Sequence, residues 1–309
     1  MKKHKICKIL LVILAIFLCV AFYELLGICV AYKKQPEVSN TIKKETQNDS
    51  WNERSENMER AVIIEKNPEA LLQRVRLIKN AKKEIILSTF AFQSDESGKL
   101  ILGALHDAAD RGVHIRLLVD GMESWIDMEG NPYFYGLSSH ENVEIKLYNK
   151  ANPLKPWKMM GRMHDKYLIA DGKRYILGGR NTYNYFLGDF PGHKNYDRDV
   201  LVVCDEPEKE NSVNQLLEYF ETIWEQEDSG YFHDNKKLAN RKSVKNAVLE
   251  LQNGYQKYFE ENKERICDTD YTDETFETEK IALVSNPIHT GSKEPVVWYQ
   301  LGELMKNAK

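Results

Sequence analysis

The sequence has few cysteines outside its N-terminal region and almost no net charge. Of its five cysteines, Cys7, Cys19 and Cys29 lie in or beside an apolar N-terminal run, which leaves Cys204 and Cys267 for the rest of the chain. Two cysteines supply neither a disulfide framework nor a zinc-ligand spacing. With 43 basic and 47 acidic residues the formal charge is -4. Composition therefore gives no electrostatic reason to expect tight, sequence-independent binding to nucleic acid.

The sequence also lacks a dinucleotide-binding glycine fingerprint and a phosphate-binding Gly-Lys-Ser/Thr loop. What it does contain is enough apolar material for a core: 42% of its 309 residues are hydrophobic. A chain of this length holds one large or two modest globular units. Disorder throughout is excluded.

The apolar run at the N-terminus is the clearest topological signal. It extends from Ile9 to Ala31 and follows four lysines, at positions 2, 3, 5 and 8. As a helix it would be roughly 35 Å long, enough to span a bilayer. The alternative is a cleaved signal peptide, but the run outlasts a signal-peptide core and Cys29-Val30-Ala31 is a poor cleavage site. We therefore expect an uncleaved anchor, and the preceding lysines favour a cytoplasmic N-terminus with the catalytic part outside, although lysines at 33, 34, 43 and 44 weaken that asymmetry.

Composition divides the chain into six segments. They are a basic flank (1–8), a transmembrane anchor (9–32), a polar stalk (33–60), an α/β domain (61–228), a helical insertion or connection (229–280) and the start of a second repeat (281–309). The last prediction depends on residues 304–309, which agree with residues 77–82 at five of six positions. A chance similarity between two lysine-rich helix ends is the alternative.

Helix and strand patterns alternate within the central domain. Helices are predicted at 68–81 and 100–111, and strands at 84–92 and 113–119, with the spacing of a parallel crossover unit. Further strands are predicted at 143–147, 166–169, 174–177 and 199–203, and a covering helix at 213–224. The predicted fold class is α/β, with a mixed sheet flanked by helices.

The strongest chemical signal lies within eighteen residues, from His164 to Asn181. His164 and Lys166 occupy alternate positions of a predicted strand, so the imidazole and the ammonium should point the same way. Imidazole is a nucleophile that titrates near neutrality, lysine supplies positive charge, and an asparagine amide can donate to a phosphate oxygen. This set handles phosphate without a metal or another cofactor. His164-Asp165 could instead be a metal-ligand pair, but that chemistry needs further ligands in a helical context.

At these residues the sequence resembles the phospholipase D superfamily, most closely its bacterial cardiolipin synthase and phosphatidyltransferase-like branch. The matching pattern reads His164-x-Lys166-x4-Asp171-x6-Gly178-Gly179-x-Asn181, and the likeness extends from about residue 61 to residue 224. Gly179 stands where the family often has serine. By the resemblance Gly178 and Gly179 belong to the substrate-binding set, but Gly179 has no hydroxyl to offer a phosphate.

The resemblance also implies a role for each polar residue of the motif. His164 would be the nucleophile that forms a phosphohistidine, and Lys166 and Asn181 would bind the phosphate. Asp199 would accept a hydrogen bond from the far imidazole nitrogen. Asp171 would mainly brace the turn between two strands.

One family feature is missing, namely a second His-x-Lys motif whose histidine protonates the leaving oxygen. The acid must therefore come from a missing C-terminal half, a dimer mate or another partner. The leading hypothesis is a membrane-anchored phosphodiesterase or phosphatidyltransferase acting on phospholipids. The alternatives are a homodimeric endonuclease of the same superfamily, which the charge balance disfavours, and a catalytically incomplete membrane protein.

Overall fold

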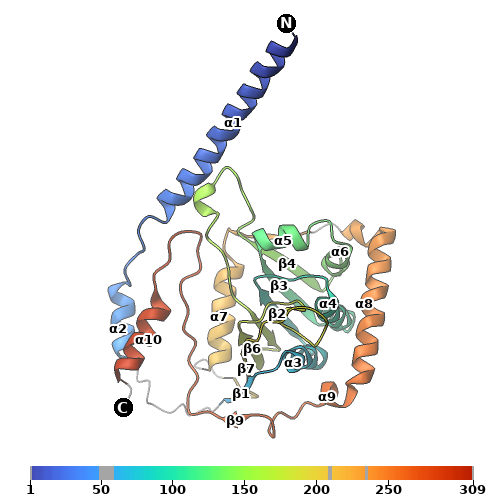
Figure 1. Ribbon diagram of the computed structural model, residues 1–309. Helices are drawn as coiled ribbons and strands as arrows, with labels where there is room; N and C mark the ends of the chain where they lie inside the picture. Colours follow the sequence, from blue (N-terminus) through green and yellow to red (C-terminus); the bar gives the residue numbers. More distant parts are fainter. Residues whose placement is uncertain (1, 49–58, 208–210, 234–235, 308–309) are drawn as a thin grey trace. The chain divides into compact units, whose positions relative to one another are not determined.

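The computed structural model describes residues 2–48, 59–207, 211–233 and 236–307 (Figure 1). These residues belong to two compact units. The larger unit draws on residues 52–150 and 163–283, and the smaller one on residues 1–51, 151–162 and 284–309. Two parts of the predicted segments, stalk residues 49–58 and the final residues 308–309, lie outside the described residues.

A mixed sheet forms the centre of the larger unit. Its strands are β1 (Arg60–Ile64), β2 (Glu84–Thr89), β3 (His114–Asp120), β4 (Val143–Tyr148), β5 (Tyr167–Ala170), β6 (Arg174–Gly178), β7 (Asp199–Val203), β8 (Ser229–Tyr231) and β9 (Phe276–Glu277). In the described residues their order is β8-β4-β3-β2-β5-β6-β7-β1-β9. Strands β2, β3 and β4 are parallel to one another and every other pairing is antiparallel. The predicted mixed α/β fold is confirmed.

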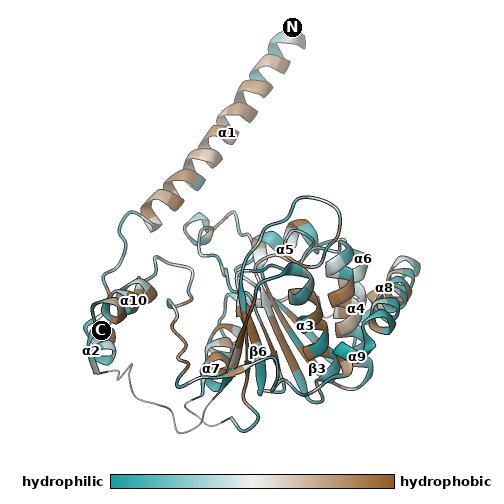
Figure 2. Ribbon diagram, turned by 60° about the horizontal axis from the view of Figure 1, so that its bottom comes forward, coloured by the Kyte–Doolittle hydropathy of each residue, from teal (hydrophilic) through white to brown (hydrophobic). Residues whose placement is uncertain are grey.

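Helices cover both faces of this sheet (Figure 1). The helices of this unit are α3 (Asn67–Asn80), α4 (Glu96–Asp110), α5 (Gly121–Asp127), α6 (Pro132–Ser138), α7 (Ser212–Trp224), α8 (Lys242–Glu261) and α9 (Lys263–Cys267). Of these, α8 and α9 form an outer layer that packs on α4, α6 and α3. On one face, Ile85 and Leu117 join the buried side chains of α3, α4 and α6 in a single core cluster. On the other face, Tyr167 meets Phe220 of α7 edge to face, with ring centroids 6.5 Å apart. Figure 2 shows apolar residues along the strands and polar residues on the outer sides of the helices.

The strand that was predicted to hold the His-x-Lys motif begins later than expected. Residues 164–166 precede β5, which starts at Tyr167. The pairing of β5 with β2 ends where Tyr167 lies opposite Ser88, and β2 itself ends at Thr89. Lys166 lies level with Thr89, the last residue of β2, and residues 164 and 165 lie beyond the end of that strand, so residues 164–166 form the loop that enters β5.

The helical segment that was predicted as an insertion is built into the larger unit. Strand β8 pairs with β4 and strand β9 pairs with β1. Helix α8 packs closely on α4, because a Cβ atom on Gly103 would lie only 2.6 Å from the carbonyl oxygen of Leu251. Residues 229–280 thus supply both edge strands of the sheet and part of its core.

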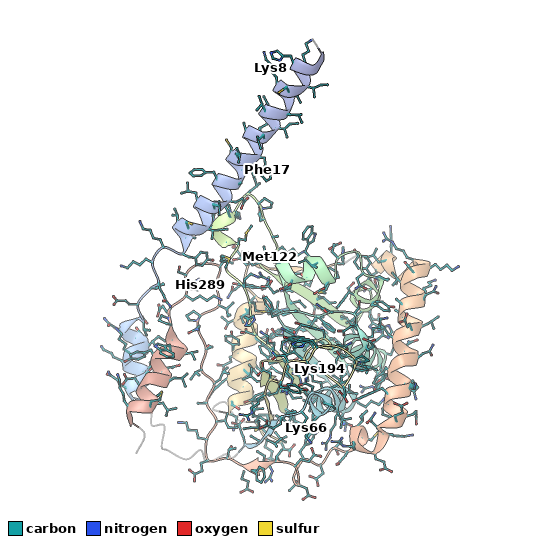
Figure 3. All side chains as sticks on the ribbon, viewed as in Figure 1. Lys8, Phe17, Lys66, Met122, Lys194 and His289 are labelled. Carbon is teal, nitrogen blue, oxygen red and sulfur yellow. The ribbon has the colours of Figure 1, made fainter. Side chains whose placement is uncertain are left out.

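The smaller unit contains a long apolar helix, α1 (Lys2–Ala31), together with α2 (Asn40–Asn48), the short 3-10 helix η1 (Pro156–Lys158) and α10 (Val296–Asn307). Helix α1 is long and apolar enough to cross a membrane. Figure 3 shows Lys8 near its start and Phe17, which is 66% exposed, pointing outward from it. Helix α2 lies within the predicted polar stalk. Helix α10 lies within residues 281–309, the predicted start of a second repeat, and contacts α2.

Candidate active site

Four of the motif residues lie together where strand ends meet at one edge of the sheet, because of the directions of strands β2, β5, β6 and β7. Strand β5 is antiparallel to β2, so the entry to β5 lies beside the end of β2. Strand β6 is antiparallel to both β5 and β7, which brings its last residue, Gly178, opposite Asp199 at the start of β7. The same edge therefore carries His164 and Lys166 before β5, Asn181 after β6, and Asp199.

His164 and Lys166 share one aromatic neighbour, Phe90, which follows β2. The His164 ring meets Phe90 edge to face with centroids 4.6 Å apart, and Lys166 Nζ lies 5.3 Å from the Phe90 ring centroid. Lys166 Nζ also donates to the carbonyl oxygen of His164 at 2.6 Å. The entry to the motif is held by Asp120 at the end of β3, whose Oδ2 accepts from the backbone N–H of Met163 at 3.1 Å. These contacts put the imidazole and the ammonium on the same side of the chain.

Burial changes the electrostatics of Lys166, which is only 5% exposed. Desolvation lowers the pKa of its ammonium to about 8, although the nearby carboxylates of Asp165 and Asp197 raise it. Asp165 is turned toward α7, where its Oδ2 accepts from the hydroxyl of Tyr219 at 2.8 Å. Lys166 is therefore mostly charged at neutral pH, and a lysine whose pKa is lowered by burial beside two carboxylates is a candidate for a functional site.

The two glycines of the motif make room for two carboxylates of the adjoining chain. A Cβ atom on Gly178 would collide with Asp199 Oδ1, and one on Gly179 would collide with Asp197 Oδ2. Gly178 is required by this close approach, because an added Cβ would also lie 2.5 Å from the carbonyl oxygen of Arg198, which is backbone. At Gly179 the added Cβ would meet the Asp197 carboxylate, which can move aside. Asp197 stands beside Gly179 and acts electrostatically on Lys166. Sequence reasoning missed it, although it precedes Asp199 by only two residues.

Asp199 has partners that the sequence did not suggest. The predicted role was a hydrogen bond to the His164 imidazole; in the structure Asp199 Oδ2 accepts from Arg74 at 2.9 Å and lies 3.3 Å from Arg180. Its other oxygen, Oδ1, is buried and has no hydrogen-bond partner among the described residues. Both Asp199 and Arg180 have fully buried side chains. This cluster of two guanidinium groups around one carboxylate lies directly behind the motif and anchors β7 to α3.

Arg180 also anchors the glycine-rich turn to the start of the domain. Its guanidinium donates to the side chain of Asn67 and to the carbonyl oxygens of Ile64 and Glu65 at 2.7–3.1 Å. The next residue, Asn181, is buried and its Oδ1 accepts from the backbone N–H of Ala91 at 3.1 Å. With Oδ1 engaged in this way, the Nδ2 group is the part of Asn181 that can donate to a ligand.

Asp171 lies at the far end of β5, away from His164. It adopts φ 55 in the turn between β5 and β6. Its carboxylate accepts from the backbone N–H groups of Lys82, Lys83 and Glu84, at distances between 2.7 and 3.1 Å. These bonds fasten the turn to the start of β2, because they satisfy donors that the incoming chain would otherwise leave to water.

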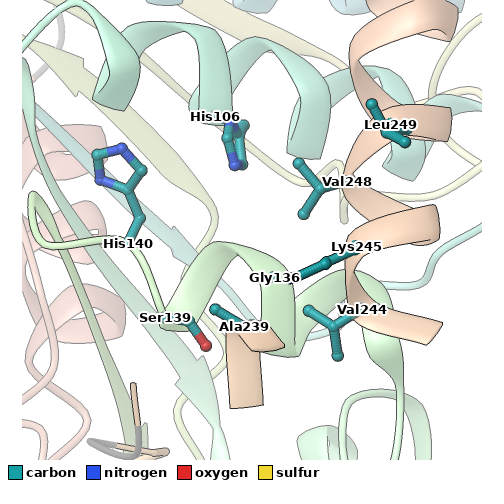
Figure 4. A pocket seen from close by; sticks show the side chains of 9 residues that line it. All are labelled: His106, Gly136, Ser139, His140, Ala239, Val244, Lys245, Val248 and Leu249. Carbon is teal, nitrogen blue, oxygen red and sulfur yellow. The ribbon is translucent and has the colours of Figure 1, made fainter. Parts of the chain in front are cut away.

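An apolar cavity lies elsewhere, between α4, α6 and α8 (Figure 4). It measures about 440 Å³ and includes His106 and His140 in its lining. Both imidazoles contact the carboxylate of Asp110, at 3.0 and 3.3 Å. In the described part of the chain no three His, Cys, Asp or Glu side chains are grouped to hold a metal ion. We regard the cavity as separate from the phosphate-handling residues, since it contains none of them.

Comparisons with known proteins match the part of the chain that contains these residues. A family model described as "Cardiolipin synthase, PLD-like domain" matches residues 74–224. An uncharacterized protein of Helicobacter pylori strain J99 is 30% identical over 212 residues, 64% of this chain and 39% of that protein. Cardiolipin synthase C of Escherichia coli K12 is 29% identical over 171 residues, 51% of this chain and 34% of that enzyme.

A solved structure titled as a phospholipase D family member, Nuc from Salmonella typhimurium, is 18% identical with a TM-score of 0.43 and covers 57% of this chain and 99% of its own. The present chain spans less than two fifths of the length of the two curated relatives. Residues 74–224 form a phospholipase D-like domain of the cardiolipin synthase type, and this domain belongs to the phospholipase D superfamily.

Proposed function

We propose that the chain is a membrane-anchored phosphodiesterase or phosphatidyltransferase that acts on phospholipids through a phosphohistidine at His164. The observation that carries this proposal is the convergence of His164 and Lys166 on Phe90 at the sheet edge that also holds Asn181. A nucleophile, a cation and an amide donor at one edge match what displacement at a phosphodiester requires. The cardiolipin synthase relative supports a phospholipid as the substrate class.

The proposed reaction has two displacements. An imidazole nitrogen of His164 attacks phosphorus, the P–N bond forms, and the bond from phosphorus to the departing alcohol breaks. That alcohol takes a proton from an acid. Water or a second alcohol then gives up its own proton and attacks phosphorus, so that a P–O bond forms, the P–N bond breaks and the His164 imidazole is released. Lys166 and Asn181 stabilise the negative charge on the phosphate oxygens in both steps. Asp197 and Asp199 are positioning residues in this scheme: Asp199 holds Arg74 and Arg180, and Asp197 acts on Lys166.

The sequence contains no second His-x-Lys motif that could supply the acid, because His164 is its only histidine followed two residues later by lysine. We propose that a second His-x-Lys half-site completes the reaction, supplied by a C-terminal half beyond residue 309, by another copy of the chain or by a complementing polypeptide. The lysines before α1 support a cytoplasmic N-terminus and an external catalytic part.

Mixing active and inactive chains tests the half-site. Wild-type chain is co-reconstituted with His164→Asn in vesicles at a series of ratios, and turnover of labelled phospholipid is measured. Activity that falls with the square of the wild-type fraction supports a site built from two copies. A linear fall contradicts the need for a second copy. His289→Asn is the matched control, since His289 lies in the smaller unit and the motif lies in the larger one. This substitution should leave turnover unchanged.

The same preparations separate the substrate classes. Turnover of phospholipid with no cleavage of single-stranded DNA or RNA supports the proposal. Nucleic-acid cleavage with a steep dependence on salt, and no phospholipid turnover, would replace it with the nuclease alternative. If the chain is inactive at every ratio and a second polypeptide restores activity, the chain is one half of a hetero-oligomer.

A further inference from the structure

The loop of residues 151–162, which joins β4 to the motif, carries unusual exposed apolar surface. Leu154 is 78% exposed, Trp157 45% and Met160 57%. Three large apolar side chains within seven residues form a local patch of the kind that marks an interaction surface. Lys155 and Lys158 lie between them in the chain.

This loop is fastened to the end of the apolar helix α1, within the smaller unit. The hydroxyl of Tyr23 donates to the carbonyl oxygen of Leu154 at 3.0 Å. Pro156 sits so close to α1 that a Cβ atom on Gly27 would lie 2.5 Å from its Cγ. One face of the helix is partly covered, at positions 21, 24, 27, 28 and 31, while positions 22, 25, 26, 29 and 30 are exposed. Beyond the loop, the hydroxyl of Ser292 donates to the carbonyl oxygen of Ala31 at the end of this face.

The length of α1 that no other described residue covers indicates where the loop lies along the membrane normal. From Ile9 to Phe22 the helix is uncovered except at position 21, and this stretch would be about 21 Å long. A hydrocarbon core is about 30 Å thick. The last turns of α1, which contact the loop, are therefore needed if the helix is to cross the whole hydrocarbon core. The loop then lies at the level of the membrane interface. Tyr23 and Trp157 at this level are the residue types that favour the membrane interface.

We propose that residues 151–162 contact the lipid bilayer that α1 spans, with Leu154, Trp157 and Met160 inserted at its edge. Lys155 and Lys158 then lie at the level of the headgroups and interact with anionic phosphates. This inference deepens the proposed function and rests on it, because the loop ends two residues before His164 in the sequence. The lipid-contacting loop would thereby be joined, along the chain, to the segment that carries the nucleophile.

Quenching of tryptophan fluorescence by brominated lipid tests the contact without any need for activity. Full-length wild type, Trp157→Phe and Trp298→Phe are reconstituted into phosphatidylcholine–phosphatidylglycerol vesicles with bromine near the headgroup end of the acyl chains. We expect Trp157→Phe to lose most of the bromolipid-dependent quenching. Trp298→Phe is the control, since Trp298 is 79% exposed but lies on α10, away from the loop in sequence. Equal quenching in wild type and Trp157→Phe would overturn the proposal.

A second measurement tests what the contact does. The triple variant Leu154→Ser, Trp157→Ser and Met160→Ser should turn over vesicle phospholipid about tenfold more slowly, the equivalent of ~1.4 kcal/mol. Its turnover of monomeric short-chain phospholipid should be unchanged, as should both activities of Leu249→Ser, which removes an equally exposed apolar side chain from α8. Equal loss on both substrates would overturn the lipid-contact role. Absence of all phospholipid turnover in wild type, both alone and with a complementing polypeptide, would refute the proposed function, while the quenching result would still decide whether the loop contacts lipid.

Discussion

Replacing Asp171 should cost stability and leave the chemistry intact. Its carboxylate accepts from three backbone N–H groups, and its φ of 55 is unfavourable for a residue with a Cβ atom. Hydrogen bonds to a charged group contribute about 1.5–3 kcal/mol each when buried, and less here because the first two donors are exposed to water. We estimate about 2 kcal/mol for the set, plus about 1 kcal/mol of backbone strain once no polar side chain offsets it.

Three substitutions separate these contributions. Asp171→Ala loses the bonds and keeps the strained backbone, so the free energy of unfolding should fall by about 3 kcal/mol. Asp171→Gly loses the bonds but relieves the strain, and should cost about 2 kcal/mol. Asp171→Asn keeps an acceptor and tolerates positive φ, and should cost about 1 kcal/mol.

Urea unfolding of the full chain in detergent micelles, followed by far-UV circular dichroism, measures these differences. Asp189→Ala, on an exposed loop, is the control and should lie within about 0.5 kcal/mol of wild type. Turnover per folded molecule should be unchanged in Asp171→Asn. A stable Asp171→Asn that has lost its turnover would refute the reasoning, because the carboxylate would then take part in the chemistry.

Three further substitutions test the sheet edge. Turnover should fall as pH rises through about 8, where the Lys166 ammonium loses its proton, and a pH profile of Lys166→Arg should lack that fall because arginine stays charged. Gly179→Ala should displace the Asp197 carboxylate, which raises the pKa of Lys166, so the fall should move to lower pH in the same assay. Asp199→Asn should lower the free energy of unfolding by about 3–5 kcal/mol in urea titrations, since it leaves the buried Arg180 without its counter-charge; a loss below about 1 kcal/mol would show that the pair contributes little.

Periodicity predicted most of the fold because its strands and helices are strongly patterned. Strand β7 was predicted with its observed bounds, and α7 to within one residue. The parallel crossover from β2 through α4 to β3 was predicted from spacing alone. Residues 229–280 were harder, since their strands are only three and two residues long and their place in the sheet depends on pairing with β4 and β1. Pairing between distant segments leaves little trace in local sequence.

The motif residues were predicted from the sequence, but the residues that support them were not. Arg74 and Arg180 look like ordinary solvated charges in the sequence, and only folding brings them 2.9 and 3.3 Å from Asp199. The role of Asp197 depends on a close approach to Gly179 that no spacing rule encodes. The glycine pair was a signal for such an approach, because a Cβ atom at either position meets a carboxylate oxygen. Tertiary proximity was the missing information in each case.

Covalent trapping tests the central claim most directly. Full-length protein in vesicles is mixed with phospholipid that carries a radiolabelled phosphate, quenched after a short incubation, digested, and analysed for labelled peptides by mass spectrometry. The account predicts an acid-labile phosphoramidate on the peptide containing His164, absent from His164→Asn and present in the His289→Asn control. Turnover by wild type with no label on His164 at any time, under conditions that preserve phosphohistidine, would contradict it.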